Sequence, residues 1–297
     1  MFRVLLCVIL FVMGPAAVAA DYLDVVLGDG AIGYWTFCED TGNFYDEVSG
    51  TFSGVRGETT AMIAGPQGTG LEPGNPAIQT GGETGFVHVV DAGGGDVTFD
   101  FLLDDWTMEA WVKPPVEGWN GAQAVIGKLL PSYIGYSLTV LDRSDDGTLE
   151  TSAFIRTGAG GWYQSVNTPW AVFGNSADEQ WHHLVASFDR SVGGKMYADG
   201  VLISEVESTV TDGVYINTNE YLNFGQKAAF APDYYYGGID EVALYRTALT
   251  AEQVAAHYAA AGLPDPVVPE PETLVLLLAG AVGLFAWKCW KLGKGKR

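Results

Sequence analysis

The sequence predicts an all-β protein folded as an antiparallel β-sandwich, and three observations support this prediction. First, short apolar or alternating runs, broken by glycine, aspartate and asparagine, follow one another between Tyr22 and Tyr245, in a chain with 39 glycines. Second, alternate residues of WTMEAWV (106–112) fall on opposite faces, which is the period of two of a strand. Third, Asp199-Gly200 separates two such runs and indicates a tight type I′ hairpin.

Nine runs are typical of the expected strands, and one helix is expected after them. The runs span 33–37, 86–91, 106–114, 136–142, 152–158, 180–189, 195–203, 221–226 and 239–245. Thr250-Ala-Glu-Gln253 has the form of a capping box, and the helix that follows is expected to end at Gly262. We therefore expect one β domain over residues 21–262, closed by a short helix, and a proline-rich linker over 263–272.

The N-terminus has the three parts of a secretory signal peptide over residues 1–20. Arg3 is its one cation, Val4 to Met13 is apolar, and 17–20 supplies the small residues of a cleavage site. The alternative is a buried first strand or helix of the domain. A signal peptide predicts that the rest of the chain is exported.

The C-terminal residues 273–297 are expected to form an apolar helix with a basic tail. Leu274 to Trp287 holds 14 uncharged residues, which is about 21 Å of helix against a hydrocarbon core of about 30 Å. Extension to Leu292, with Lys288 and Lys291 reaching the headgroups, gives 19 residues and a marginal transmembrane span. By the positive-inside rule, the basic tail should stay inside.

Before this apolar segment stands the triplet Pro269-Glu270-Pro271, and after it stands the basic cluster from Lys288 to Arg297. This order resembles the PEP-CTERM sorting domain. The resemblance implies an exosortase as partner, a membrane protease-transpeptidase that removes the anchor and releases the protein to the envelope or the extracellular polysaccharide. A permanent single-span anchor is the alternative.

The expected exported body is strongly acidic. Six of the 15 Lys and Arg and none of the 36 Asp and Glu lie in the two terminal segments, so residues 21–272 have nine basic and 36 acidic residues, a net charge of −27. This charge argues against nucleic acid or anionic lipid as a partner, because both would be repelled. Cys38 is the only cysteine between those segments, so the body has no intrachain disulfide, and we expect this residue to be a small buried hydrophobe.

Several phrases of the body, YWTF, WTMEAWVKP, WHHLVASFD and KMYADGVLI, occur in a fixed order between Gly33 and Tyr258, and GGIDEVALYRTALTAEQV (237–254) is the most specific of them. This order resembles the laminin-G-like, pentraxin-related jelly rolls of the concanavalin A-like class. The resemblance implies a concanavalin A-like antiparallel β-sandwich jelly roll.

Known catalytic arrangements are missing from the sequence. Retaining glycosidases of this fold place two carboxylates close together on one strand, but no E-x-D-x-E, GxSxG or HExxH pattern occurs, and Glu109 stands alone in its strand. His182 and His183 are strand neighbours, so they point to opposite faces, one to the core and one to solvent, and cannot chelate one metal. The D-x-S-x-D-G pattern at 142–147 lacks the Glu of a calcium loop, because Ala153 stands there.

The family resemblance also implies one structural Ca²⁺ where an N-terminal DxSG turn meets the GxIDE strand. Asp240 matches the strand, whereas the turn Asp46-Glu-Val-Ser-Gly50 has one residue more than the family spacing, so the turn ligand is Asp46 or Glu47. Capping of the turn by Asp46 is the alternative. With Asp240 as a ligand, Glu241 is expected on the opposite face of the sheet.

Ligand recognition by a sugar-binding protein needs aromatic rings that stack on sugars. Trp162, Tyr163, Tyr234 and Tyr235 lie in or beside expected loops and are the candidates, with packing in the sandwich as the alternative. We therefore predict an exported, non-enzymatic recognition or adhesion module that binds extracellular glycan or matrix. The alternatives are a carbohydrate-active enzyme, either glycosidase or lyase, and a structural matrix protein.

Overall fold

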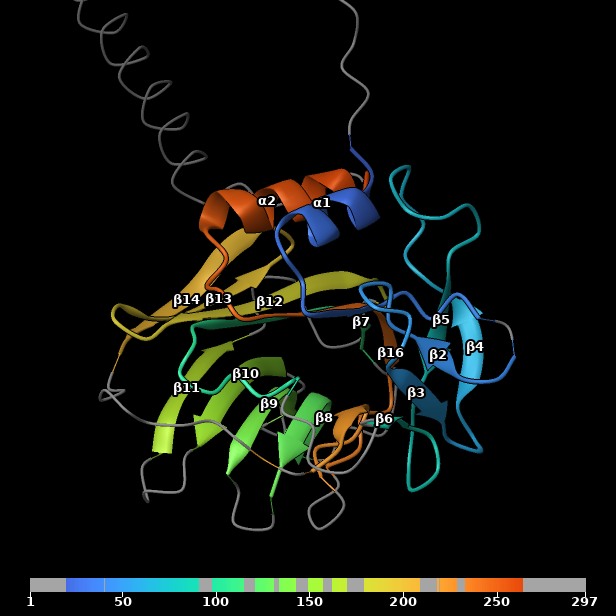
Figure 1. Cartoon of the computed structure of the whole chain (residues 1–297), viewed down its shortest axis with the longest axis horizontal. Helices are drawn as coiled ribbons and strands as arrows, with labels where there is room; N and C mark the ends of the chain where they lie inside the picture. The colour runs from blue at the N-terminus through green and yellow to red at the C-terminus, as the bar shows by residue number, and fades with distance from the viewer. Residues whose placement is uncertain are drawn as a thin grey trace, which may run out of the picture. The chain divides into compact units, whose positions relative to one another are not determined.

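Two β-sheets lie face to face, and two helices cover the outer face of one of them (Figure 1). The computed structural model describes residues 20–39, 41–90, 98–114, 121–130, 134–142, 149–156, 162–169, 179–208, 218, 220–228 and 233–263. The expected signal peptide up to residue 19, the Pro269-Glu270-Pro271 triplet and the C-terminal apolar helix lie outside these residues. Within the described part, neither helix is long and apolar enough to span a bilayer.

Sheet 1 lies beneath the helices and follows the order β14-β13-β12-β7-β16-β5-β4, with β1 paired to β16 beside this path. Its strands are β1 (Gly33–Trp35), β4 (Ala61–Ala64), β5 (Pro76–Gln79), β7 (Trp106–Lys113), β12 (His182–Asp189), β13 (Gly193–Ala198), β14 (Val201–Glu207) and β16 (Gly238–Tyr245).

Sheet 2 follows the order β11-β10-β9-β8-β15-β6-β3-β2. Its strands are β2 (Phe44–Tyr45), β3 (Ser53–Arg56), β6 (Val87–Val90), β8 (Gly121–Leu129), β9 (Gly135–Asp142), β10 (Leu149–Arg156), β11 (Trp162–Pro169) and β15 (Leu222–Phe224). The ladders between the strands of both sheets are antiparallel. The predicted antiparallel sandwich is confirmed.

The runs predicted as strands coincide with strands of the structure to within a few residues. The run at 195–203 contains two strands, β13 and β14, joined at the predicted hairpin, where Asp199 and Gly200 have φ of 47° and 77°. Both angles are positive, as a type I′ turn requires. The strands outside the predicted runs include short ones such as β2 and β4, but also the long strands β8 and β11.

The domain has two hydrophobic cores because both faces of sheet 1 are covered. Trp106, Met108, Ala110 and Val112 of β7 point into the core between the sheets, and Trp111 points into a second core beneath the helices. The predicted alternation is therefore confirmed, but neither face of this strand meets solvent.

Two helices build the second core. α2 (Ala251–Ala260) begins with the predicted capping box, in which the Thr250 side chain accepts from Gln253 N and the Gln253 side chain accepts from Thr250 N. α1 (Tyr22–Gly28) was not predicted, and its Tyr22 side chain is fully buried in the second core. The domain thus places a short helix directly after the expected signal peptide.

Candidate functional site

Glu109 of β7 lies fully buried beneath the helices and accepts hydrogen bonds from four side chains. The donors are Tyr22 Oη at 2.7 Å, Tyr245 Oη at 2.8 Å, His183 Nε2 at 2.7 Å and His257 Nδ1 at 3.0 Å. They come from α1, β16, β12 and α2, so this carboxylate joins both helices to sheet 1. Although burial alone would raise the pKa of Glu109, the two histidines hold it well below its usual value.

His257 is positively charged in this cluster. Its Nε2 lies 2.9 Å from Asp29 Oδ2 and its Nδ1 lies 3.0 Å from Glu109, so each ring nitrogen faces a carboxylate and carries a proton. Burial opposes this charge, but Glu109 and Asp29 together raise the pKa of His257 to about 9. The partners of Glu109 are thus groups of the protein itself, which indicates a structural role for this carboxylate.

His182 and His183 differ from the prediction in one respect, because neither faces solvent. His183 is fully buried beneath the helices, and His182 is 6% exposed with its Nδ1 2.8 Å from Asp199 Oδ2. The strand does send them to opposite faces, since His183 pairs with Trp111 and His182 pairs with Val112. One of the two histidines was expected to face solvent. Instead, the helices cover His183, and His182 contacts the turn at Asp199.

Asp240 and Glu241 of β16 lie on the same face of sheet 1, which corrects the expectation of opposite faces. The ladder to β7 has a bulge between Asp240 and Ala243, and Glu241 adopts φ of 49° there. Asp240 pairs with Trp111 and so points to the helix side, while the extra residue turns Glu241 to that side as well, where Tyr34 donates to it. Two neighbouring carboxyl groups are thereby buried together.

Neither of these carboxyl groups has a cationic partner among the described residues. Asp240 Oδ2 accepts from Asn75 Nδ2 at 2.7 Å, and its Oδ1 is buried without a hydrogen-bond partner. Burial and the neighbouring carboxyl raise the pKa of Asp240 well above its usual value, and burial raises the pKa of Glu241 to about 8. These two groups therefore hold protons more strongly than ordinary carboxyl groups.

The turn residue Asp46 caps its own loop, as the alternative interpretation proposed. Its carboxylate accepts from Val48 N, Ser49 N, Ser49 Oγ, Thr51 N and Phe52 N, at 2.8 to 3.3 Å. Both oxygens are engaged, so Asp46 is a poor fit for a calcium ligand, whereas the unpaired Asp240 Oδ1 fits that role. The described residues contain no group of three or more His, Cys, Asp or Glu placed to hold a metal, and the calcium site stays a prediction.

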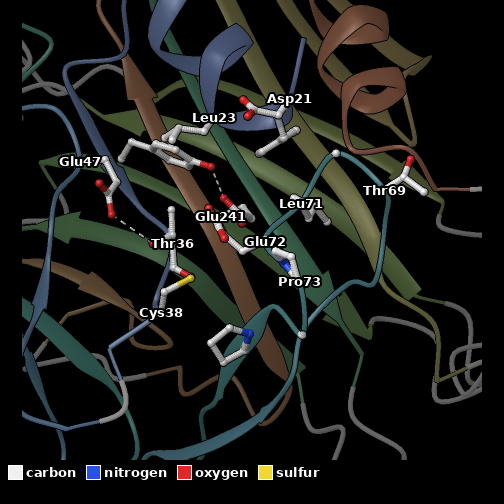
Figure 2. A pocket seen from close by; sticks show the side chains of 15 residues that line it. Asp21, Leu23, Thr36, Cys38, Glu47, Thr69, Leu71, Glu72, Pro73 and Glu241 are labelled. Atoms are coloured by element: carbon white, nitrogen blue, oxygen red, sulfur yellow. Dashed lines mark hydrogen bonds between the residues drawn. The ribbon is translucent and has the colours of Figure 1, made fainter. Parts of the chain in front are cut away.

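The side chain of Glu241 lies at the wall of an acidic cavity of about 680 Å³ between α1, β1 and the loop at 69–76 (Figure 2). Four carboxyl groups line it, from Asp21, Glu47, Glu72 and Glu241, and no Lys, Arg or His does. Glu47 accepts from Thr36 Oγ1 at 3.3 Å, and burial raises its pKa. The cavity thus brings the predicted Glu47 together with Glu241, which lies beside the predicted Asp240.

Cys38 also lines the acidic cavity and is half-buried. Burial raises the pKa of this thiol to about 11, so it is protonated at neutral pH and unreactive as a nucleophile. This placement is more polar than the buried hydrophobic position expected from the sequence.

A second hollow, the aromatic groove, lies on the outer face of sheet 2 and has a volume of about 260 Å³. Leu222 and Phe224 of β15 and Val87 and Val89 of β6 point into the core between the sheets. The residues between them, Asn223 and His88, are paired with each other and therefore point outward. The groove is lined by Glu83, Phe86, His88, Leu129, Glu220, Tyr221, Asn223, Gln226 and Ala228.

Three aromatic rings of this groove, those of Tyr221, His88 and Phe86, form a row that Tyr234, which is not a lining residue, extends beyond it. The ring centroids of Tyr221 and His88 are 5.6 Å apart, those of His88 and Phe86 are 5.7 Å apart, and those of Phe86 and Tyr234 are 6.2 Å apart. Tyr221 is 53% exposed at one end of the row. Burial lowers the pKa of His88, so its imidazole is neutral at pH 7 and can both donate and accept a hydrogen bond.

The four aromatic residues predicted as ligand contacts are dispersed over the domain. Tyr234 belongs to the aromatic row, whereas Trp162 and Tyr163 lie on β11, at the far edge of sheet 2, where the structure describes the backbone. Tyr235 is fully buried in the core, and its hydroxyl donates to Lys113 O at 2.9 Å. The prediction of Tyr235 as a ligand contact is wrong, because this side chain is fully buried in the core between the sheets.

The groove residues Phe86, His88 and Tyr221 were not singled out from the sequence, although a signal was present. Phe86 and His88 are two positions apart in the predicted strand 86–91, and Tyr221 and Asn223 are two apart in 221–226. Aromatic residues on the polar face of a strand are the expected mark of a binding surface. The acidic cavity carries no such mark, because its four carboxyl groups come from distant parts of the chain.

Solved structures of similar fold are described as binding domains of toxins. The binding domain of Paraclostridial Mosquitocidal Protein 1 aligns with a TM-score of 0.59 and 13% identity, over 78% of this chain and 52% of that one. The botulinum neurotoxin serotype D ligand binding domain in complex with N-acetylneuraminic acid aligns with a TM-score of 0.57 and 11% identity, over 79% and 52%. The chain thus spans about half the length of these domains, and at such identities the likeness shows the fold.

A search of curated proteins gives no match. A family model described as the concanavalin A-like lectin/glucanases superfamily matches residues 80–255, which is more than half of the chain. This range includes most of the strands of both sheets, the aromatic groove and the start of α2. The chain belongs to this family.

Proposed function

We propose that the protein is a carbohydrate-binding module and that the aromatic groove holds a glycan chain. The observation that carries this proposal is the row Tyr221, His88, Phe86 and Tyr234 on the open face of sheet 2. Such rings stack on the apolar faces of sugars, and the neutral imidazole of His88 can exchange hydrogen bonds with hydroxyl groups. The fold shared with domains described as ligand- or receptor-binding supports the proposal.

The charge of the groove favours a neutral glycan. Glu83 and Glu220 line it, and among the described lining residues there is no Lys or Arg. The surrounding body is also acidic, so a sialylated or uronic polysaccharide would be repelled. The ligand class differs in this respect from N-acetylneuraminic acid, which is anionic.

A carbohydrate-active enzyme is the second candidate, because Glu83 and Glu220 are two carboxylates in one groove. They come from two separate loops, before β6 and before β15, and not from one strand as in the retaining glycosidases of this fold. We therefore propose binding without cleavage.

Export completes the proposal. The signal peptide over 1–20 would deliver the body across the membrane, and the segment with Pro269-Glu270-Pro271 would anchor it transiently until an exosortase-type enzyme cuts there. The destination is the cell envelope, outer surface or extracellular polysaccharide. Intact-mass measurement of protein purified from its native host should show that residues 288–297 are missing, and a mass that includes them would favour a permanent anchor.

The test of ligand class is calorimetry of the full-length protein with a panel of neutral and anionic polysaccharides. We expect weak heats of binding from neutral chains such as glucans or galactans and none from sialylated or uronic chains. Reducing ends are measured in the same samples, and their release would favour the enzyme. No heat from any neutral glycan, with a folded protein, would favour a structural matrix role.

A further inference from the structure

The acidic cavity beneath α1 has at its wall a buried carboxyl group that uses only one of its two oxygens within the protein. Glu241 is 2% exposed and lines the cavity, and the Tyr34 hydroxyl is its one hydrogen-bond donor among the described residues. Its second oxygen therefore has no protein partner. A buried carboxyl group with a free oxygen is costly unless something pairs with it.

The rim of the cavity adds three more carboxyl groups, from Asp21, Glu47 and Glu72, which are exposed to solvent (Figure 2). They come from three separate segments, namely the N-cap of α1, the turn after β2 and the loop before β5. Since no Lys, Arg or His lines the cavity, nothing in the described wall neutralises them. The potential inside is negative, and a cation is the complementary ligand.

The size and the apolar part of the wall favour an organic cation over a metal ion. The volume of about 680 Å³ suits a small molecule, and the carboxyl groups are too dispersed to form a group of three metal ligands. Tyr22, Leu71 and Pro76 contribute apolar surface beside them. An aliphatic stem could lie on this surface while its charged end reaches the wall.

We propose that the acidic cavity binds a primary ammonium group on an aliphatic stem, with Glu241, which releases its proton to solvent on binding, as its counter-ion and with Glu47 and Glu72 at the rim. A free aliphatic diamine and a lysine side chain of a peptide supply this same chemistry. Such binding satisfies the free oxygen of Glu241 and places three N–H donors beside oxygens of the wall. This site is separate from the aromatic groove and does not depend on glycan binding.

Titration calorimetry of the full-length protein with cadaverine tests the proposal, with 1-pentanol as the uncharged analogue and the peptide Gly-Lys-Gly as the second source of the ammonium group. We expect saturable binding of cadaverine and none of pentanol. Binding of Gly-Lys-Gly as tight as that of cadaverine would indicate a protein partner, and weaker binding would indicate a free amine. Absence of binding for both amines would overturn the proposal.

Variants assign the binding to the cavity. Glu241→Gln keeps the shape and the acceptor for Tyr34 and should weaken cadaverine binding at least tenfold. Glu72→Gln removes an exposed rim charge without touching a buried group and should weaken it severalfold, so the proposal stays testable if Glu241→Gln fails to fold. Glu58→Gln, at an exposed carboxylate outside the cavity, is the matched control and should change nothing.

Two further results would contradict the proposal. If Glu241→Gln and Glu72→Gln bind cadaverine as tightly as Glu58→Gln does, the amine lies elsewhere on the acidic surface. If millimolar Ca²⁺ displaces cadaverine and Glu241→Gln abolishes a heat of Ca²⁺ binding, the cavity is a metal site instead.

Discussion

The outer faces of the two sheets of this sandwich differ in what covers them. On sheet 1 the helices α1 and α2 close the face, so that Glu109, His183 and His257 are buried, with both histidines hydrogen-bonded to Glu109. On sheet 2 neither of the two described helices lies over the outer face (Figure 1), and Tyr221 of the aromatic row is 53% exposed. The polar residues with the most conspicuous chemistry thus hold the fold together, and the less conspicuous aromatic ones face the solvent.

This difference shows that residue type alone does not identify a site. A glutamate with two histidines and two tyrosines would suggest catalysis, yet each hydrogen-bonding partner of Glu109 is already inside the protein. A ligand can reach Tyr221, because it is 53% exposed, and cannot reach Glu109, because it is fully buried. Burial therefore separates the structural face from the binding face.

The largest expected effect comes from removal of the buried carboxylate on the structural face. Glu109→Ala leaves the His257 charge without its main partner and leaves Tyr22 and Tyr245 unpaired, so it should lower the free energy of unfolding by about 3 to 5 kcal/mol. Urea unfolding measures this loss. A loss no larger than that of an exposed control such as Glu58→Ala would show that the cluster does not hold the helices.

Tyr234 and Tyr235, neighbours in the segment that connects β15 to β16, should respond differently to substitution by alanine. Tyr235→Ala empties a fully buried site and should cost about 3 to 5 kcal/mol of stability, by comparison with other buried aromatic residues. Tyr234→Ala removes a partly exposed ring and should cost much less. Equal losses of melting temperature in the two variants would contradict the assignment of Tyr235 to the core.

The charge of His257 predicts how the structural face responds to pH. Its folded-state pKa of about 9 lies above the ordinary value of 6.5, so its stabilisation is fully present below pH 6.5 and is lost as the pH rises through about 9. Integrated over this window, the contribution is at most about 3 kcal/mol. The wild type should therefore lose stability relative to His257→Gln between these pH values, and parallel pH profiles would contradict a charged His257.

Addition of Ca²⁺ tests whether the bulge of β16, with its two carboxyl groups, is part of a metal site. If Ca²⁺ binds the folded state through the unpaired Asp240 Oδ1, it should stabilise by about 2.7 kcal/mol at a hundredfold excess over Kd. The melting temperature should rise with Ca²⁺ and fall back with a chelator, and Asp240→Asn should abolish the rise. A wild-type melting temperature that does not change with Ca²⁺ would contradict the predicted calcium site.

The sequence predicts the fold well because the strands carry strong local patterns. The alternation of β7, the Asp199-Gly200 turn and the capping box at Thr250 each depend on neighbours within a few residues. Burial of the outer face of sheet 1 does not depend on such local patterns. It requires α1 and α2 to pack on a sheet that distant segments form. For this reason the sequence assigned His182 or His183 to solvent and missed α1.

The candidate sites follow the same rule. The bulge that brings Asp240 and Glu241 to one face requires a positive φ at a glutamate, which no sequence pattern indicates. The row of Tyr221, His88, Phe86 and Tyr234 joins three chain segments that only the pairing of β6 with β15 and the bridge from Ala124 to Tyr234 bring together. Their outward direction was readable from alternation, but their proximity was not.

The central claim, that the open face of sheet 2 binds glycan, is tested most directly with two exposed tyrosines of that sheet. Tyr221 and Tyr45 are 53% and 48% exposed, and of the two only Tyr221 lines the groove. Tyr221→Ala should weaken binding of a neutral polysaccharide about tenfold, which corresponds to about 1.4 kcal/mol for one lost stacking contact, with an unchanged melting temperature. Tyr45→Ala should bind as the wild type does. Equal affinities for the two variants, measured by calorimetry on the same polysaccharide, would contradict the claim.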